Sequence, residues 1–245
     1  MVLCAAADES GSWLRDGLRV RGLHDVELVS VDELVYSPSL THRVSTDAVT
    51  TEIRLWDGRI IGPALRGVVN RATFLPLDHL DKVGEPDRSY ATQELYALFA
   101  SVLFGLPGRI VNPGGPYGLS GPTLHHAQWC VAASQAGLMV SHTRYPGTDT
   151  AEQRLSSRCQ VLVVGAATIV LHGSTTASAG LSVPPEIAAG CRRLAAAQGV
   201  EVLQVDFDDA EHWAFVGAEV HPDLRRGGDQ VLDALADYLV PGGSS

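Results

Sequence analysis

The residues with the clearest chemical potential lie near the C-terminal end, in the stretch GVEVLQVDFDDAEHWAFVGAEVHPDL (199–224). Its pattern predicts two strands, 200–207 and 213–220, joined by a short acidic turn. Side chains two residues apart share one face of a strand, so Glu219 and His221 are expected to point the same way. Asp206, on the first strand, joins them if the register of the hairpin allows it.

One histidine and two carboxylates that converge at strand ends can bind a divalent cation or transfer protons. Asp206, Glu219 and His221 are therefore the candidate catalytic residues and also a candidate metal site. The competing interpretation is that the two acids are exposed strand-end residues beside a solvated turn (208–211). Both interpretations depend on the register of the hairpin, which the sequence leaves open.

The composition limits the classes of function. With 245 residues, 45% of them hydrophobic and 19% charged, the chain can bury a sizeable core in one large domain or two small ones. A net charge of −10 argues against nucleic acid or an anionic membrane as the partner. No apolar run is long enough to span a bilayer and no basic leader precedes the first strand, so we expect a cytoplasmic protein.

The four cysteines are far apart in the sequence and show no zinc-binding spacing. We expect them to be reduced and mostly buried, as is usual for free thiols in a cytosolic protein. They stand at Cys4, Cys130, Cys159 and Cys191.

The order of the predicted elements indicates an α/β fold. A strand at 2–7, a helix at 10–22 and a strand at 26–35 predict a parallel β-α-β unit. It has no Gly-x-Gly-x-x-Gly fingerprint. Asp57-Gly58 predicts a tight hairpin, and Gly165-Ala166 predicts a second one. Further helices are expected at 87–106, 120–138, 183–199 and 229–240, the second of which should bury Trp129 and Val131.

Polar residues at the ends of these elements form a candidate substrate site. Asn70 and Arg71 end one predicted strand, and the following helix carries Tyr90 and Glu94. An Arg71–Glu94 pair would fix strand to helix as a structural ion pair, or would clamp a carboxylate or a peptide backbone. The remaining members of this candidate site are Asn112, which follows another strand, and His172, at a strand end beside a polar segment.

The C-terminal hairpin resembles the end of an ATP-grasp ligase. In that family a closing Glu-x-Asn-Pro motif and an upstream acidic residue hold the magnesium ions of ATP. Here Glu219 and Pro222 keep their places, Asp206 matches the upstream acid, and His221 stands where the family has asparagine. Imidazole is a poor ligand for magnesium.

The N-terminal half resembles the same family, in particular the grasp ligases that modify peptides. The shared order of its motifs over some hundred residues is the specific feature. The resemblance implies a pre-ATP-grasp-like domain over 1–145 and a reduced α+β ATP-grasp subdomain over 158–240. The motifs are Asp57-Gly58, Asn70-Arg71, Tyr90 with Glu94, Asn112-Pro113, and the strand from Gly137 to Thr143.

After that strand, a grasp ligase has a whole ATP-binding lobe, for which 144–158 leaves no room. The chain has a single lysine, Lys82, far in sequence from the family's phosphate-binding positions, and Gln160 stands where the family has a catalytic arginine. Arginine and lysine are not interchangeable at triphosphate sites. We therefore expect no cofactor: ATP should not bind, and a divalent metal at Asp206, Glu219 and His221 is the weaker option.

The resemblance implies an ATP-grasp relative that has lost its nucleotide lobe. Such a chain would bind a peptide or small metabolite in the biosynthesis of a natural product, as a pseudo-ligase or accessory protein. One alternative is an ATP-independent enzyme with a repurposed Asp/Glu/His site. Another is a split ligase completed by a partner chain. The expected partners are a peptide or small molecule, a partner ligase, and a second copy in a homodimer, since loss of a lobe exposes surface.

Overall fold

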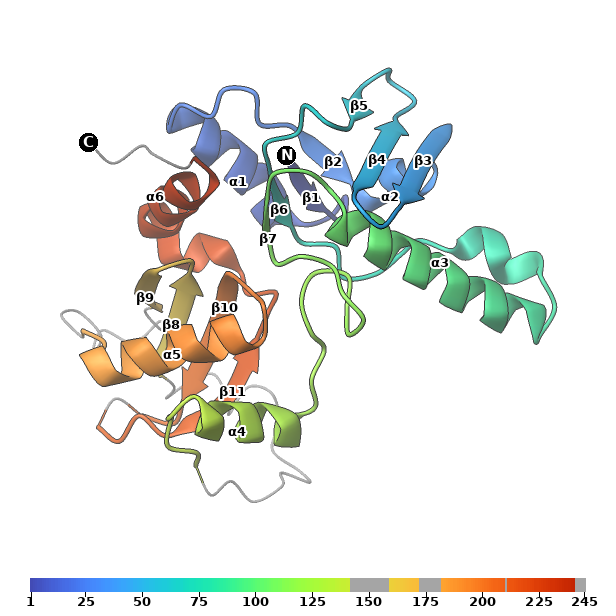
Figure 1. The fold of residues 1–245 in the computed structure, drawn as a ribbon. Coiled ribbons are helices and arrows are strands. Elements are labelled where there is room, and N and C mark those ends of the chain that lie inside the picture. The colour runs from blue at the N-terminus through green and yellow to red at the C-terminus, as the bar shows by residue number, and fades with distance from the viewer. Residues whose placement is uncertain (142–158, 172–181, 210, 241–245) are drawn as a thin grey trace. The chain divides into compact units, whose positions relative to one another are not determined.

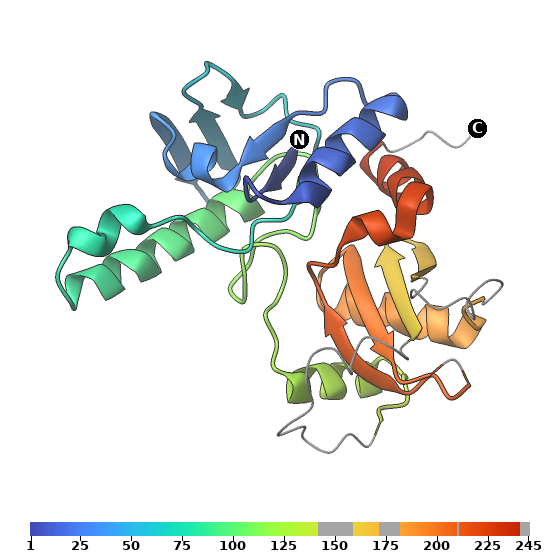
Figure 2. The same ribbon diagram turned by 180° about the vertical axis from the view of Figure 1, so that it is seen from behind.

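The computed structural model describes residues 1–141, 159–171, 182–209 and 211–240, which fall into two compact units, 1–122 and 123–245 (Figures 1 and 2). The chain has the predicted α/β fold, and its described residues form one parallel and two antiparallel sheets. The expected domains, 1–145 and 158–240, divide the chain at a different place, because the helix after Pro122 packs within the second unit. The loop expected to join them, 146–157, lies outside the described residues.

The first unit is built on a parallel sheet. Its strands are β1 (Val2–Cys4), β2 (Leu28–Ser30), β6 (Gly67–Asn70) and β7 (Arg109–Val111), in the order β2-β1-β6-β7. The helix α1 (Glu9–Val20) connects β1 to the parallel β2 and so confirms the predicted β-α-β unit. β1 therefore lies between the strand that follows it and a strand from later in the chain.

Helices lie on both sides of this sheet. On one side, α1 approaches β1 so closely that a Cβ at Gly11 would clash with the Cys4 sulfur. On the other side, Leu3 belongs to a core cluster with Phe99 and Val102 of α3 (Asp87–Phe104). Alternation along β1 accounts for this division, since neighbouring strand residues face opposite sides.

A small antiparallel sheet completes the first unit. Its strands β3 (Ser39–Val44), β4 (Val49–Arg54) and β5 (Ile60–Ile61) are joined in that order. The predicted turn at Asp57-Gly58 is confirmed, with Gly58 at φ 88°, a conformation that favours glycine. A short 3₁₀ helix, η1 (Asp78–Lys82), precedes α3 and lies beside its N-terminal half (Figure 1).

One predicted strand of this unit is wrong in its second half. The strand expected over 26–35 ends at Ser30, and Val31–Val35 form the helix α2. The Ser30 side chain accepts a hydrogen bond from the Glu33 backbone, and the Glu33 carboxylate accepts one from the Ser30 backbone. This capping box favours a helix start over a continued strand.

The second unit contains an antiparallel sheet with helices packed on it. Its strands are β8 (Cys159–Val164), β9 (Ala167–Leu171), β10 (Val202–Phe207) and β11 (Phe215–Glu219), in the order β11-β10-β8-β9. The helices α4 (His126–Gln135) and α5 (Pro185–Ala197) bury one face, in the cluster that contains Val161, Val163, Leu203 and Val205. The segments η3 (Leu224–Gly227) and α6 (Gly228–Leu239) contact β8 and β9 through residues such as Leu162 and Leu171 of the opposite face.

The prediction that α4 buries Trp129 and Val131 is confirmed for only one of the two. Trp129 is buried as predicted, whereas Val131 is 58% exposed because it lies on the side of α4 turned away from the sheet. The helix expected to start at 120 starts at His126, with His125 at the N-cap. None of the described helices combines the length and apolar character needed to cross a membrane.

Candidate functional site

Polar residues occupy one end of the sheet face that η3 contacts. In the ladder Asp206 lies opposite Gln160 on β8 and Gly217 on β11, while Gln204 lies opposite Glu219. Residues directly opposite each other share a face, so Gln160, Gln204, Asp206 and Glu219 point to the same side. We call these four residues the polar row.

The Asp206 carboxylate is held by two amides of the polar row. Its Oδ1 accepts hydrogen bonds from Gln160 Nε2 and Gln204 Nε2, each at 2.9 Å. The Arg226 guanidinium donates to Gln160 Oε1 and so fixes the orientation of that amide. Gln160 and Gln204 are only 6% and 4% exposed, and buried amides of this kind require partners. Asp206 therefore serves as the acceptor for two buried donors.

The expected convergence of Asp206, Glu219 and His221 is only partly observed. Asp206 and Glu219 share a face at diagonal positions of the ladder. His221 lies two residues beyond the end of β11, where the chain has left the ladder, so strand alternation no longer sets its direction. Among the described residues, no group of three His, Cys, Asp or Glu side chains is placed to hold a metal ion. The structure therefore does not assemble the predicted three-residue metal centre.

The acidic turn between β10 and β11 is organised by its own carboxylates. Asp208 Oδ1 accepts from the Ala214 backbone, and Asp209 Oδ1 accepts from the backbones of Glu211 and His212. These backbone N–H groups lower the pKa of Asp209, while the hydrogen bond to Asp209 raises the pKa of the exposed His212. These contacts agree with the solvated-turn interpretation of 208–211.

A second polar cluster lies in the first unit, where β1, β6 and β7 end. Ligands of open parallel sheets usually bind at the carboxyl ends of strands, at the point where the strand order reverses. Here that point is between β1 and β6, because β2 and β6 flank β1 on opposite sides. Asn70 is the last residue of β6, Arg71 follows it, and Asn112 follows β7, so the structure brings these three predicted residues to one edge.

Asn70 links the loops of this edge. Its Nδ2 donates to the carbonyls of Asn112 at 2.9 Å and Leu119 at 2.8 Å, and its Oδ1 accepts from the Ala72 backbone at 3.2 Å. The backbone of Asn112 has φ 54°, in the left-handed region that asparagine tolerates better than most residues. The Ser120 hydroxyl donates to the Ala72 carbonyl in the same cluster.

Arg71 pairs with Asp8, which was not among the predicted site residues. Its Nε donates to Asp8 Oδ2 at 2.6 Å, and the two side chains are 11% and 19% exposed. Asp8 also caps α1 by accepting from the Ser10 backbone. The expected Arg71–Glu94 pair is therefore replaced by Arg71–Asp8, because Tyr90 and Glu94 are exposed on α3.

Cys4 ends β1 beside this ion pair. Burial raises the pKa of its thiol to about 11, with the Asp8 carboxylate adding to the rise and Arg71 opposing it. The thiol therefore stays protonated at neutral pH and is unsuited to nucleophilic chemistry. His172, the remaining candidate substrate residue, lies outside the described residues.

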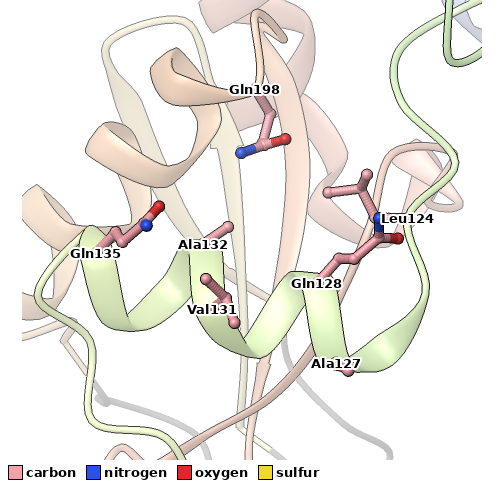
Figure 3. Close-up of a pocket in the computed structure, with 7 residues that line it drawn as sticks. All are labelled: Leu124, Ala127, Gln128, Val131, Ala132, Gln135 and Gln198. Carbon is pink, nitrogen blue, oxygen red and sulfur yellow. The ribbon is translucent and has the colours of Figure 1, made fainter.

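A shallow apolar groove runs along α4 in the second unit (Figure 3). Its volume is about 340 Å³, and its floor is formed by Leu124, Ala127, Val131 and Ala132. Its rim consists of amide side chains, with Gln198 at the end of α5 pointing toward α4 (Figure 3). Those amides belong to Gln128, Gln135 and Gln198. The groove has no charged lining residue.

Several residues of these sites were not among the predicted ones. The sequence pattern could have identified Gln204, because a polar residue two positions before Asp206 in an apolar strand shares its face. It could also have identified Asp8, because an acidic residue between a strand and a helix is typical of a helix N-cap. No sequence pattern indicates the groove, since an exposed valine on a helix is common.

Comparisons with known proteins define the class of fold. The chain matches the macrocyclase MdnC of Microcystis aeruginosa, solved with the precursor peptide MdnA, with a TM-score of 0.68, 13% identity and coverage of 97% of this chain and 98% of that one. It matches a RiPP-associated ATP-grasp ligase of Chryseobacterium gregarium, solved with ADP and a leader and core peptide, with a TM-score of 0.65 and 10% identity over 97% and 95% of the chains. It also matches the ATP-grasp ligase PsnB, solved with a minimal precursor, with a TM-score of 0.64, 14% identity and coverage of 98% of both chains.

The chain thus has the fold of RiPP-associated ATP-grasp ligases, as the motif order predicted. No family model and no curated protein sequence matches it. Because the structural alignments extend over nearly the whole of both chains, they do not support the expected loss of a nucleotide lobe. The segment on which that expectation rested, 144–158, lies outside the described residues.

Proposed function

We propose that this chain is a peptide-binding protein with the ATP-grasp ligase fold, which takes part in the modification of a peptide natural product without itself holding Mg-ATP. It would act as an accessory protein or pseudo-ligase beside a complete ligase. The groove on α4 supports peptide binding, in a fold whose solved representatives contain precursor peptides. The surroundings of Asp206 support the loss of nucleotide binding.

The hydrogen bonds of Asp206 and the scarcity of lysine both disfavour binding of Mg-ATP. Magnesium requires carboxylate oxygens that are free to coordinate it, whereas Asp206 Oδ1 accepts from two buried amides. A triphosphate requires several cationic or N–H donors at once. The single lysine, Lys82, is exposed on η1 of the first unit, and no other lysine exists in the chain. We infer that these hydrogen bonds to Asp206 Oδ1 stand in place of a metal site in the polar row.

The groove suits a short, uncharged peptide segment. Its apolar floor can bury small aliphatic side chains, and each rim glutamine offers both a donor and an acceptor to a peptide backbone. A charged ligand would find no opposite charge among the lining residues. The repurposed-enzyme alternative has less support, because the described residues do not gather Asp206, Glu219 and His221 into a metal group.

The Val131→Arg variant tests this assignment. Arginine would place a charge on the apolar floor, so we expect at least a tenfold loss of affinity for groove-bound peptides, about 1.4 kcal/mol. The full chain is used to select binders from a phage-displayed library of random dodecapeptides, and the selected peptides are then synthesised and measured by calorimetry.

Uncharged, aliphatic-rich peptides with micromolar affinity for the wild type and weakened binding to Val131→Arg support the proposal. Val20→Arg is the matched control, since Val20 is an exposed valine on α1 of the other unit. Peptides that bind Val131→Arg as tightly as the wild type, or a selection that returns no binder, would refute the groove as the peptide site.

A further inference from the structure

The edge strand β3 has backbone groups that β4 does not use. It is the outer strand of the small sheet, with β4 on one side and no described strand on the other (Figure 1). With six residues it is the longest edge strand that the structure describes. The β3–β4 register runs without a shift from Ser39 to Val44, so no bulge twists the edge away. The strand also contains no proline, a residue that would remove a backbone donor from the edge.

Several other edges of the described sheets are covered or very short. The Leu28 carbonyl of β2 accepts a hydrogen bond from the Arg59 guanidinium at 2.9 Å. Phe215 of β11 donates to the Met139 carbonyl and accepts from the Ser141 amide. β5 and β7 have only two and three residues. Natural sheets protect their edges in these ways because an open edge pairs with another chain, and β3 departs from that rule.

The hydrogen bonds of the hairpin identify which groups of β3 face the open side. The Ser45 amide donates to the Ala48 carbonyl, so these two residues form a hydrogen-bonded pair. Such pairs alternate with non-hydrogen-bonded pairs along an antiparallel ladder. Alternate residues of β3 therefore bond to β4 with their backbone, and the residues between them direct their amides and carbonyls to the open side, over about 14 Å of strand. The residues that face the open side are Leu40, His42 and Val44.

The same three residues have their side chains on the inner face of the small sheet. Leu40 packs against the core of the first unit, and His42 bonds to Thr51 Oγ1 and Ser101 Oγ, each at 2.9 Å. Val44 shares this face and is 66% exposed. Side chains of an added strand on the inner face would therefore meet Leu40 and Val44. Aliphatic side chains suit that contact.

The outer face of β3 carries a cation. Arg43 is exposed, and its side chain forms no ion pair or hydrogen bond with a described residue. Glu52 lies diagonally across from it on β4, on the side away from the open edge. A residue of an added strand directly opposite Arg43 would be in a non-hydrogen-bonded pair, with the Cβ atoms about 4.5–5.5 Å apart. Opposite charges stabilise such a pair, so an acidic side chain is favoured at this position.

From these observations we propose that β3 binds an extended peptide as an additional antiparallel strand of the small sheet. Aliphatic side chains of the peptide lie on the inner face, and acidic ones lie on the outer face beside Arg43. In this mode of recognition the main-chain hydrogen bonds supply affinity and the alternate side chains supply selectivity. The inference uses the first unit alone, so it holds or fails independently of the uncharged peptide proposed for the groove on α4.

Nuclear magnetic resonance of the ¹⁵N-labelled full chain tests the pairing residue by residue. The probe is an eight-residue peptide of alternating valine and glutamate with both termini blocked. As it binds, the amides of Leu40, His42 and Val44 should shift and exchange with solvent at least tenfold more slowly, because they gain hydrogen bonds. The amides of Thr41 and Arg43 already bond to β4 and should stay protected throughout.

N-methylated peptides provide a matched pair of probes. Valines of the bound peptide lie opposite the residues whose backbone faces the open side, so their N–H groups point at β3. Methylation of the valine nitrogens should therefore abolish binding. Methylation of the glutamate nitrogens, which point away from β3, should leave the affinity within about twofold of that of the unmodified peptide.

The Arg43→Glu variant tests the charge preference. It should weaken binding of the valine–glutamate peptide at least tenfold and favour a valine–lysine peptide instead. Arg54→Glu is the matched control, because Arg54 is an exposed arginine on the same face but one strand further from the open edge. This control should bind the valine–glutamate peptide as the wild type does.

Unchanged amides of Leu40, His42 and Val44 at about 1 mM peptide would overturn the proposal. Equal binding of the two methylated peptides, or equal losses in Arg43→Glu and Arg54→Glu, would overturn it as well. Shifts of these amides that depend on protein concentration without peptide would assign the edge to a second copy of the chain. Slow exchange of these amides in the peptide-free chain would assign it to the chain's own second unit, and either result would contradict a peptide site.

Discussion

Replacing Asn70 by alanine is expected to destabilise the first unit by about 3 kcal/mol. The side chain is 2% exposed and joins the loops after β6 and β7 through three hydrogen bonds. Alanine would leave the carbonyls of Asn112 and Leu119 and the N–H of Ala72 without this partner. Each buried group that loses its partner costs about 1–3 kcal/mol, and part of that cost is recovered by relaxation.

Hydrogen exchange followed by mass spectrometry is the suitable measurement, because it reports each unit separately. Amides of β6 and β7 should exchange about a hundredfold faster in Asn70→Ala than in the wild type, while those of β8 and β10 should not change. Gln93→Ala, which removes an exposed amide on α3 of the same unit, should leave all rates near those of the wild type. Unchanged protection of β6 and β7 would show that Asn70 does not hold this edge together.

Replacing Asp206 by alanine is expected to destabilise the second unit by a similar amount, about 3 kcal/mol. Gln160 Nε2 and Gln204 Nε2 would lose their common acceptor while remaining buried. Asp206→Asn keeps an acceptor oxygen of nearly the same shape, so it should cost about 1 kcal/mol or less. The comparison of the two variants isolates the hydrogen-bonding role from the charge.

The same exchange measurement on β8 and β10 distinguishes a structural carboxylate from a working metal ligand. An empty magnesium ligand is held among like charges, so its removal leaves stability unchanged or improves it. A stability of Asp206→Ala equal to or above that of the wild type would therefore contradict a structural role for these hydrogen bonds. Loss of protection in Asp206→Ala, with near-wild-type protection in Asp206→Asn, is the result that we expect.

Local signals in the sequence predicted much of the fold. Hydrophobic spacing with proline and glycine boundaries located α3 and α5, and Asp57-Gly58 located the β4–β5 hairpin. The two apolar runs after residue 158, joined at Gly165-Ala166, predicted the β8–β9 hairpin. These features depend on residues close together in the chain. The helix α2 was missed because the capping pair Ser30 and Glu33 lies inside a run that also alternates like a strand.

The candidate sites were predicted less well, because they depend on contacts between distant segments. Asp8 and Arg71 are 63 residues apart, and nothing local indicates that Arg71 pairs with Asp8 and not with Glu94. Alternation predicted that Glu219 and His221 share a face, with Asp206 joining them only if the register allowed it. The ladder puts Asp206 and Glu219 on one face, whereas His221 lies beyond the end of β11. The donors that satisfy Asp206 come from β8 and β10, and the Arg226 that orients Gln160 follows β11.

The central claim is that the polar row has replaced a magnesium–nucleotide site, and titration calorimetry with Mg-ATP on the full chain tests it most directly. An ATP-grasp ligase solved with ADP, such as that of Chryseobacterium gregarium, is the positive control. We predict no measurable heat of binding and an unchanged melting temperature at 1 mM Mg-ATP. Binding at about 10 μM would instead add about 2.7 kcal/mol of stability under those conditions, and such micromolar binding by the pure chain would contradict the account.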